Sequence, residues 1–198
     1  MTQDLRAVAW PVRTARLALR PATPDDLDAV WRVRRRPGVD DWLSHDVGDR
    51  DPYVARLLDP DRLSRLLVIE LDGRVVGDLT LHLEDAWAQS ADDEDRVRQQ
   101  QAILGWVLDP ELGGRGYATE AVAELLRICF EDLGLRRVRA YCFADNEPSW
   151  RLMERLGMRR EEHSVRDSLH RSRGWLDGMA YALLADEWRD QRSRTPHV

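Results

Sequence analysis

The stretch GGRGYATEA, Gly113–Ala121, constrains the fold of this chain more than any other segment. It follows the apolar run AILGWVL after a DPEL connector, and it opens a helical pattern of apolar residues. Glycine adopts positive φ angles and lets the backbone approach a ligand closely. The first amides of a helix lack internal partners and carry partial positive charge, so a strand, a glycine-rich turn and a helix start together predict an anion site. A diphosphate is the anion that we expect there.

Two nucleotide-binding alternatives fit this stretch poorly. A P-loop requires GxxxxGK[ST], and the chain contains no lysine. A dinucleotide-binding fingerprint requires GxGxxG and an acidic residue about 20 positions later. Here Thr119 stands at the third glycine, and Arg136, not an acid, begins the next strand. A glycine-containing loop that only turns the chain remains an alternative at this point.

The apolar periodicity predicts alternating strands and helices around this segment. Asp72-Gly73 between two alternating runs is typical of a tight hairpin, and Thr23 before Pro24 is typical of a helix start. The expected strands cover residues 15–20, 66–71, 74–83, 102–108 and 138–143. The segment 158–185 should supply two more, joined by a turn at 175–178, and the second of these is MAYALLADEW. The first expected helix begins at Thr23, and three more cover residues 52–58, 116–133 and 146–156. This order predicts an α/β (α+β) fold, a single mixed sheet of about seven strands with helices on both faces.

The composition limits the class of protein. With 198 residues, the chain is long enough for one domain with its own core. The net charge of -6 disfavours nonspecific binding to nucleic acid, so we expect no such partner. Because no segment resembles a signal peptide or a membrane span, we expect a cytoplasmic protein without membrane contact. Cys129 and Cys142 lie in apolar runs without metal-ligand spacing, so we expect reduced thiols and no metal.

Two signatures in the second half of the chain carry a family resemblance. The Gly113–Ala118 loop matches the pattern Gln/Arg-x-x-Gly-x-Gly/Ala, and Asn146–Ser149 with Arg155–Met158 matches Asn-x-x-Ser followed by Lys/Arg-x-Gly-Phe/Met. The chain thereby resembles the Gcn5-related N-acetyltransferase (GNAT) superfamily, in particular its RimJ/RimL-like ribosomal-protein branch. It departs from the pattern at Gly113, where the family has Gln or Arg, so the backbone amides remain and a side-chain contact is lost.

The resemblance covers about Ala15 to Trp188 and implies the fold and the cofactor. It implies a single acyl-CoA N-acyltransferase domain over residues 1–188, with a tail over 189–198 that we expect to be disordered. It also implies a splayed sheet, in which the 102–108 and 138–143 strands part at their ends and admit acetyl-CoA as cosubstrate. The acyl-CoA-binding residues implied in this way are Trp106, Val107, Leu108, Gly113, Gly114, Arg115, Gly116, Tyr117, Ala118, Thr119, Asn146, Ser149 and Arg155.

Transfer of an acetyl group from a thioester to an amine requires three functions in the protein. A base removes a proton from the amine, hydrogen-bond donors stabilise the oxyanion, and an acid protonates the leaving thiolate. The resemblance nominates Ser149 as the acid and a backbone N–H of residues 106–108 for the oxyanion. An alternative is that Asn146 and Ser149 only cap their helix.

The base is predicted from the 74–84 strand. Its alternation places Asp78, Thr80, His82 and Glu84 on one face. That face could line the acceptor cleft or could be covered or solvated. We predict that His82 or Glu84 acts as the base through a water molecule.

The predicted activity is transfer of acetyl from acetyl-CoA to a primary amine, a protein or peptide N-terminal α-amine, by direct attack in a ternary complex. Two alternatives stay open: a small-molecule amine or antibiotic as acceptor, and a non-catalytic acyl-CoA-binding module. The acidic segments 40–51 and 84–95 carry Trp42 and Trp87, which favours a cationic amine if they flank the acceptor; solvated loops are the alternative. These two tryptophans and Trp10 also suggest a homodimer.

Overall fold

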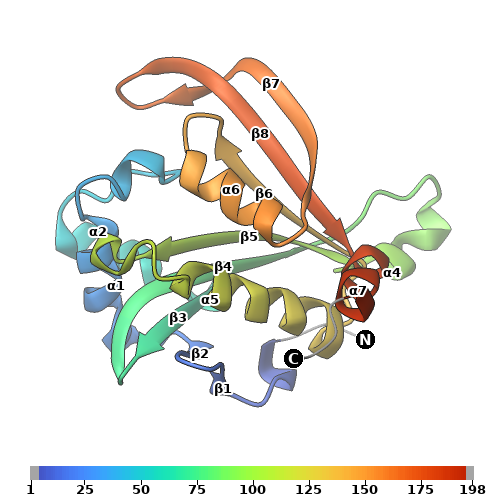
Figure 1. The fold of residues 1–198 in the computed structure, drawn as a ribbon, viewed down its shortest axis with the longest axis horizontal. Helices are drawn as coiled ribbons and strands as arrows, with labels where there is room; N and C mark the ends of the chain where they lie inside the picture. The colour runs from blue at the N-terminus through green and yellow to red at the C-terminus, as the bar shows by residue number, and fades with distance from the viewer. Residues whose placement is uncertain (1–4, 195–198) are drawn as a thin grey trace. The chain divides into compact units, whose positions relative to one another are not determined.

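The computed structural model describes residues 5–194, in which strands and helices alternate (Figure 1). Within these residues, the strands form one mixed eight-stranded sheet in the order β1-β2-β3-β4-β5-β6-β8-β7. The strands are β1 (Val12–Arg13), β2 (Ala18–Pro21), β3 (Leu66–Leu71), β4 (Arg74–Glu84), β5 (Gln101–Leu108), β6 (Arg137–Phe143), β7 (Arg159–His170) and β8 (Gly174–Leu184). The predicted α/β class is confirmed, and the strand beyond the expected seven is the two-residue β1.

Seven α-helices lie between these strands in the described residues. They are α1 (Leu27–Arg34), α2 (Arg50–Leu57), α3 (Pro60–Leu63), α4 (Glu94–Val97), α5 (Tyr117–Arg127), α6 (Glu147–Arg155) and α7 (Ala185–Arg194). Helix α5 continues as a π-helical turn, Ile128–Asp132. Gly134, which the sequence places at the end of this helix, has a φ of 65°. No helix among residues 5–194 combines the length and the apolar character that a membrane crossing needs.

The described chain divides into two units. The first, here called the glycine-loop unit, comprises residues 9–81 and 105–124. The second, here called the hairpin unit, comprises residues 5–8, 82–104 and 125–194. Strands β4 and β5 and helix α5 each contribute residues to both units.

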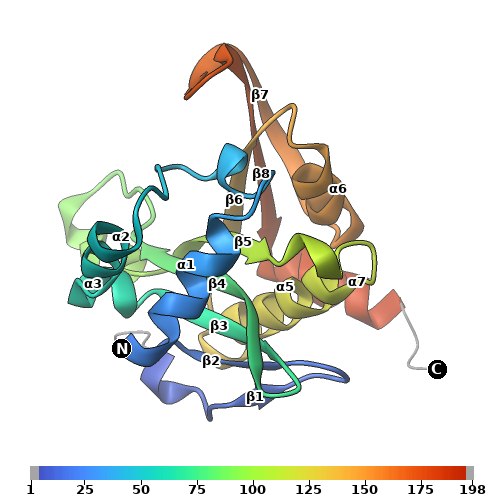
Figure 2. The same cartoon turned by 90° about the vertical axis from the view of Figure 1, so that its left-hand side faces the viewer.

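Local signals in the sequence explain much of the glycine-loop unit. The β3–β4 hairpin turns at Asp72 and Gly73, whose φ angles of 51° and 74° are those of the predicted tight turn. Ahead of α1, Thr23 donates its N–H to Asp26 Oδ2 at 2.8 Å, so the predicted helix start is confirmed. Helices α1 and α2 pack together (Figure 2). With β3 they enclose a buried core made of Ala22, Leu27, Val30, Val47, Tyr53, Leu57, Leu66 and Val68.

The hairpin unit is built on β8, which pairs antiparallel with β6 on one side and with β7 on the other (Figure 1). The predicted turn at 175–178 is wrong, because these residues lie inside β8 and the chain turns at residues 171–173. Gly178 permits close strand packing there, since a Cβ at this position would lie 2.6 Å from Asp167 Oδ1.

The end of the chain also differs from its prediction. The segment ADEW was expected to extend the last strand, but it starts α7. The Glu187 carboxylate accepts a hydrogen bond from the Leu184 N–H at 2.9 Å and so satisfies a free amide at the helix start. Residues 189–194 of the expected disordered tail are therefore helical, while residues 195–198, like 1–4, lie outside the described residues.

Candidate functional site

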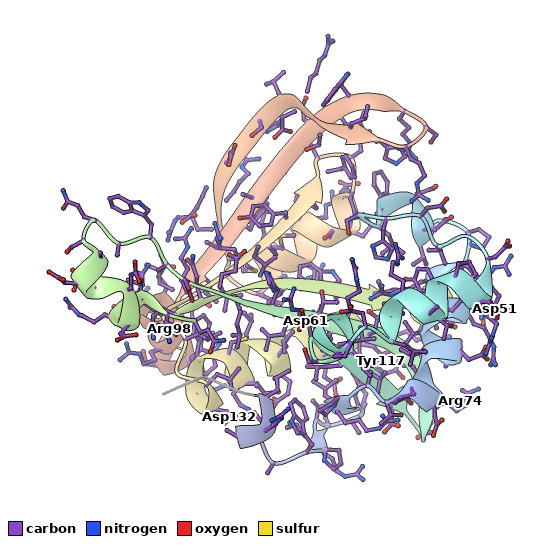
Figure 3. All side chains as sticks on the ribbon, turned by 180° about the vertical axis from the view of Figure 1, so that it is seen from behind. Asp51, Asp61, Arg74, Arg98, Tyr117 and Asp132 are labelled. Atoms are coloured by element: carbon purple, nitrogen blue, oxygen red, sulfur yellow. The ribbon has the colours of Figure 1, made fainter. Side chains whose placement is uncertain are left out.

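The glycine loop has the backbone that an anion site needs. Gly113 to Gly116 are all exposed, and Gly114 and Gly116 have φ angles of 73° and 79°. The first helical hydrogen bond runs from the Glu120 N–H to the Gly116 carbonyl at 3.0 Å. The amides of Gly116, Tyr117 and Ala118 precede this bond at the start of α5 (Figure 3 labels Tyr117). A Cβ on Gly114 would meet nothing within 4 Å, so no protein atom crowds the loop at this position.

A side chain that the sequence analysis missed braces this loop. Arg16, between β1 and β2, donates from Nε to Glu120 Oε2 at 2.7 Å and from Nη1 to the Arg115 carbonyl at 2.9 Å. Its guanidinium carbon lies 4.3 Å from the centre of the Tyr117 ring. Arg16 stands about a hundred residues before the loop, and the ARLALR pattern indicates only a strand. No local signal could have placed it here.

Glu120 is the anchor of this brace. Its Oε1 accepts hydrogen bonds from the Thr14 hydroxyl at 2.5 Å and from the Arg16 N–H at 2.8 Å. Partial burial opposes ionisation of Glu120, but the hydrogen bonds from Thr14 and Arg16 outweigh it and hold the pKa of the carboxyl below its usual value. The carboxylate therefore stays charged near the positive end of α5.

The end of β5 carries the three predicted strand contacts. Val107 is buried, while Trp106 and Leu108 are half-buried. Beside them, β4 approaches so closely that a Cβ on Gly77 would collide with the Val107 carbonyl. The parallel β5–β6 ladder pairs Gln101–Leu104 with Arg137–Ala140 and ends there, halfway along β5.

Asn146 and Ser149 lie at the start of α6 in the hairpin unit. Asn146 makes no capping hydrogen bond with its side chain, so the capping alternative does not account for this residue. The Ser149 hydroxyl lies near the Cys142 thiol. Burial raises the pKa of Cys142 to about 11, and the Ser149 contact partly opposes this rise. Arg155 is exposed in the last turn of α6.

His82 and Glu84 lie near each other at the end of β4. The His82 Nε2 is 4.0 Å from Glu84 Oε1, and Glu84 forms an ion pair with Arg139. The His82 Nδ1 is buried and has no hydrogen-bond partner among residues 5–194. Because Glu84 is already engaged by Arg139, His82 is the member of this pair with an uncommitted ring nitrogen.

Of the alternatives left open for this face of β4, the structure shows that it is covered at Asp78. Asp78 is 1% exposed and accepts two hydrogen bonds from Arg34, at 2.9 Å to Oδ2 and 2.5 Å to Oδ1. Arg34, itself 4% exposed, also donates to the Tyr53 hydroxyl at 2.8 Å. His45 Nε2 lies 3.1 Å from the same hydroxyl. Arg34 lies 44 residues before Asp78, so alternation along β4 could not identify Arg34 as the ion-pair partner of Asp78.

The acidic segment that follows β4 forms a concave surface within the hairpin unit. A cavity of about 430 Å³ is lined by residues 85–91, Glu94, Val97 and Arg98. Trp87 on this surface is 85% exposed, whereas Trp10 and Trp42 are half-buried. Of the three tryptophans considered for a dimer interface, only Trp87 is therefore available on the surface of this chain.

Comparison with known proteins identifies related sequences. A sequence model of the acetyltransferase (GNAT) domain matches residues 16–159. YdaF of Bacillus subtilis (strain 168), itself a proposed ribosomal N-acetyltransferase, is 31% identical over 121 residues, which are 61% of this chain and 60% of YdaF. The chain spans 49% and 60% of the lengths of the first two curated relatives that it matches.

Two solved structures have a similar fold. A GNAT-family acetyltransferase from Bacillus anthracis shares 26% identity at a TM-score of 0.74, covering 89% of this chain and 99% of the other. RimJ of Mycobacterium smegmatis, solved in complex with CoA-disulfide, shares 26% identity at a TM-score of 0.68, covering 90% of each chain.

Proposed function

This chain belongs to the GNAT acetyltransferase family, and from that premise we propose that it transfers an acetyl group from acetyl-CoA to a primary amine. The observation that supports this most strongly is the glycine loop, with its positive φ angles and its open amides at the start of α5. The loop lies inside the region that matches the family, residues 16–159. An exposed loop that only turned the chain would not need two glycines with positive φ, one residue apart, before a helix.

We assign the cosubstrate contacts to the residues predicted from the sequence. The amides from Gly114 to Ala118 hold the diphosphate, because they are the groups at the helix start without helical partners. The backbone of Trp106–Leu108 and the side-chain amide of Asn146 hold the pantetheine arm. When bound, acetyl-CoA supplies an activated acetyl thioester, and the protein supplies the proton transfers and the oxyanion contact.

The proton transfers are assigned to side chains of the hairpin unit. Ser149 donates its hydroxyl proton to the departing sulfur; the neighbouring Cys142 thiol is a weak acceptor and does not compete strongly. His82 accepts the proton of the amine through a water molecule, because its side chain is partly exposed whereas Glu84 is engaged by Arg139. The cationic amine gives one proton to His82 before its nitrogen bonds the carbonyl carbon, and the C–S bond breaks as the oxyanion collapses. The second proton on the nitrogen replaces, through water, the proton that Ser149 gives to the thiolate.

For the acceptor, we propose a protein or peptide N-terminal α-amine. The name of the relative YdaF, a proposed ribosomal N-acetyltransferase, supports this choice. The acidic concave surface of residues 85–98 with exposed Trp87 suits a cationic amine, since carboxylates attract it and an indole face binds it. A small-molecule amine would find the same attraction, so the acceptor experiment must distinguish the two.

The test is a mass-spectrometric acceptor screen with the full chain and acetyl-CoA. Matched peptides with a free or a formylated N-terminus are compared with a panel of small amines, including aminoglycosides. We expect acetylation of peptides with a free N-terminus and none of their blocked counterparts. Turnover confined to small amines would refute the peptide assignment, and CoA binding without any turnover would identify a non-catalytic acyl-CoA-binding module.

The homodimer is a separate proposal that rests on exposed Trp87. Light scattering over micromolar concentrations measures the molar mass directly. A mass near the 22.9 kDa of one chain at all concentrations would refute the dimer.

A further inference from the structure

The glycine loop has no side chain at the position where the resembled pattern has Gln or Arg, the second of which is a cation. Gly113 stands there, exposed and with nothing beyond its backbone to offer an anion. A diphosphate carries more than one negative charge, and backbone amides with a helix dipole supply only partial positive charge. The bound anion would gain from a guanidinium, which donates in a planar fork and stays charged at every physiological pH.

Arg16 brings such a group to the loop from the turn between β1 and β2. Its Nε and Nη1 are committed to Glu120 and to the Arg115 carbonyl. The Nη2 lies 3.4 Å from the Cβ position of Gly116 and makes no hydrogen bond to any residue in the described range 5–194. The protein thus holds two nitrogens of this guanidinium in place. The third nitrogen lies beside the loop, where it can donate to a ligand.

The anchor also explains how a carboxylate is tolerated in the first turn of α5. Glu120 would repel a diphosphate at the helix start if its charge were uncompensated. Arg16 lies 2.7 Å from it and offsets that repulsion, while Thr14 fixes the other oxygen. The Tyr117 ring supports the opposite side of the guanidinium at 4.3 Å. The side chain of Arg16 thus has little freedom to lose when a ligand binds.

We propose that Arg16 is a diphosphate-binding residue that supplies, from outside the loop, the cation that Gly113 does not. This inference rests on the proposed function, because it requires a CoA thioester or CoA itself as the ligand of the loop. It assigns Arg16 to the diphosphate and not to the 3′-phosphate of CoA, since its free nitrogen points to the glycine backbone. Arg16 thereby acts on binding of the cosubstrate and not on the chemistry of transfer.

The test is calorimetric binding of CoA, 3′-dephospho-CoA and pantetheine to the full chain and to Arg16→Ala. A charge-assisted hydrogen bond predicts an affinity loss of about 10- to 100-fold. We expect the same loss for CoA and for 3′-dephospho-CoA, and no loss for pantetheine, which lacks the diphosphate. Arg16→Lys retains the charge but not the fork, so its loss should be intermediate. Arg13→Ala removes an exposed arginine three positions earlier and should bind all three ligands as the unaltered chain does.

Each possible result has a distinct meaning. Equal CoA affinity in Arg16→Ala and the unaltered chain would overturn the inference while leaving the proposed function intact. A loss for CoA but not for 3′-dephospho-CoA would assign Arg16 to the 3′-phosphate, and an equal loss for pantetheine would make it a structural brace; both overturn the proposal. If Arg16→Ala melts at a lower temperature, the Arg16→Lys variant decides the matter. No binding of CoA by the unaltered chain would refute the proposed function and this inference together.

Discussion

Two arginine–carboxylate pairs in the glycine-loop unit have the same chemistry and different surroundings. The side chains of Arg34 and Asp78 are 5% and 1% exposed. The other contacts of the Arg34 guanidinium are also with buried or half-buried side chains. The side chains of Arg16 and Glu120 are 43% and 17% exposed, and Arg16 keeps a nitrogen at the surface beside the glycine loop. The buried pair can therefore contact only other groups of the fold, whereas the exposed pair can also contact a ligand.

The difference follows from solvation. Near water, an ion pair gains little because each partner is already well solvated alone. In the interior, neither partner is solvated, so each depends on the other for its hydrogen bonds. Although burial opposes the charge of Arg34, Asp78 and Tyr53 raise its pKa above the usual value, so the guanidinium remains a cation inside the unit. The comparison predicts that the same chemical change costs much more stability at the buried pair than at the exposed pair.

The largest expected effect is that of Asp78→Asn on stability. This change leaves the buried Arg34 cation without its counter-ion, which costs about 3–5 kcal/mol in comparable pairs. Urea unfolding followed by tryptophan fluorescence measures the change. The double variant Arg34→Met/Asp78→Leu removes both charges and should recover most of the loss. A cost below about 1 kcal/mol for the single variant would show that burial does not separate the two pairs.

This pair also marks where prediction from sequence fails. Alternation along β4 correctly places Asp78 on the face opposite Leu79, but it cannot say that Arg34 covers that face. The Asp72-Gly73 turn, the helix start at Thr23 and the glycine loop were predictable because each signal is complete within a few residues. Arg16 was missed for the same reason as Arg34, since both act on residues distant in sequence.

Local signals can also mislead when a glycine has another purpose. The run Trp175–Gly178 was interpreted as a turn, yet Gly178 lies in β8 and pairs with Ser164 and Phe143. Its bare Cα accommodates Asp167 and Ser168 of the neighbouring strand. The glycine pattern alone does not distinguish a turn from a close approach between two strands.

Ser149→Ala sharpens the comparison because it removes a group assigned to chemistry. Loss of a general acid lowers kcat by about 10²–10⁴-fold, whereas the contact of this hydroxyl with Cys142 is too weak to matter much for folding. Steady-state kinetics should show a reduced kcat, and calorimetry should show CoA affinity within about twofold of the unaltered chain. An unchanged kcat would reduce Ser149 to a packing contact of α6.

Gly116→Val tests the exposed region by shape, without changing charge. A valine strains the φ of 79° and places carbon where the ligand approaches, so CoA affinity should fall by at least about tenfold. Gly73→Val is a matched control, because Gly73 has a φ of 74° and lies in the β3–β4 turn. The control carries the same backbone strain and should bind CoA normally. Equal affinities in the two variants would remove the ligand from the loop.

An intermediate pair allows the comparison to be tested by pH. The guanidinium of Arg20 donates to both oxygens of Asp26, and with Thr23 it lowers the pKa of that carboxyl to about 2. Because the folded pKa lies below the ordinary value near 3.8, the stabilisation is complete above pH 4 and is lost as the pH falls toward 2. Partial exposure of Arg20 limits it to about 1–2 kcal/mol. Asp26→Asn should therefore be less stable by this amount at pH 7, and the difference should shrink as the pH falls toward 2, as measured by urea unfolding.

The smallest expected effect completes the comparison, because Glu120→Gln is the exposed counterpart of Asp78→Asn. The glutamine oxygen can still accept from Thr14, and Arg16 regains solvent when its partner loses charge. We therefore expect a stability loss below about 1 kcal/mol, and a loss that shrinks further when salt is raised from about 0.05 to 0.5 M, because salt screens exposed charges. The cost of Asp78→Asn should not change over the same range, since its pair is shielded from ions. A salt-independent cost at Glu120 as large as that at Asp78 would mean that the Arg16 pair holds the fold together, and Arg16 would then have no spare capacity for a diphosphate.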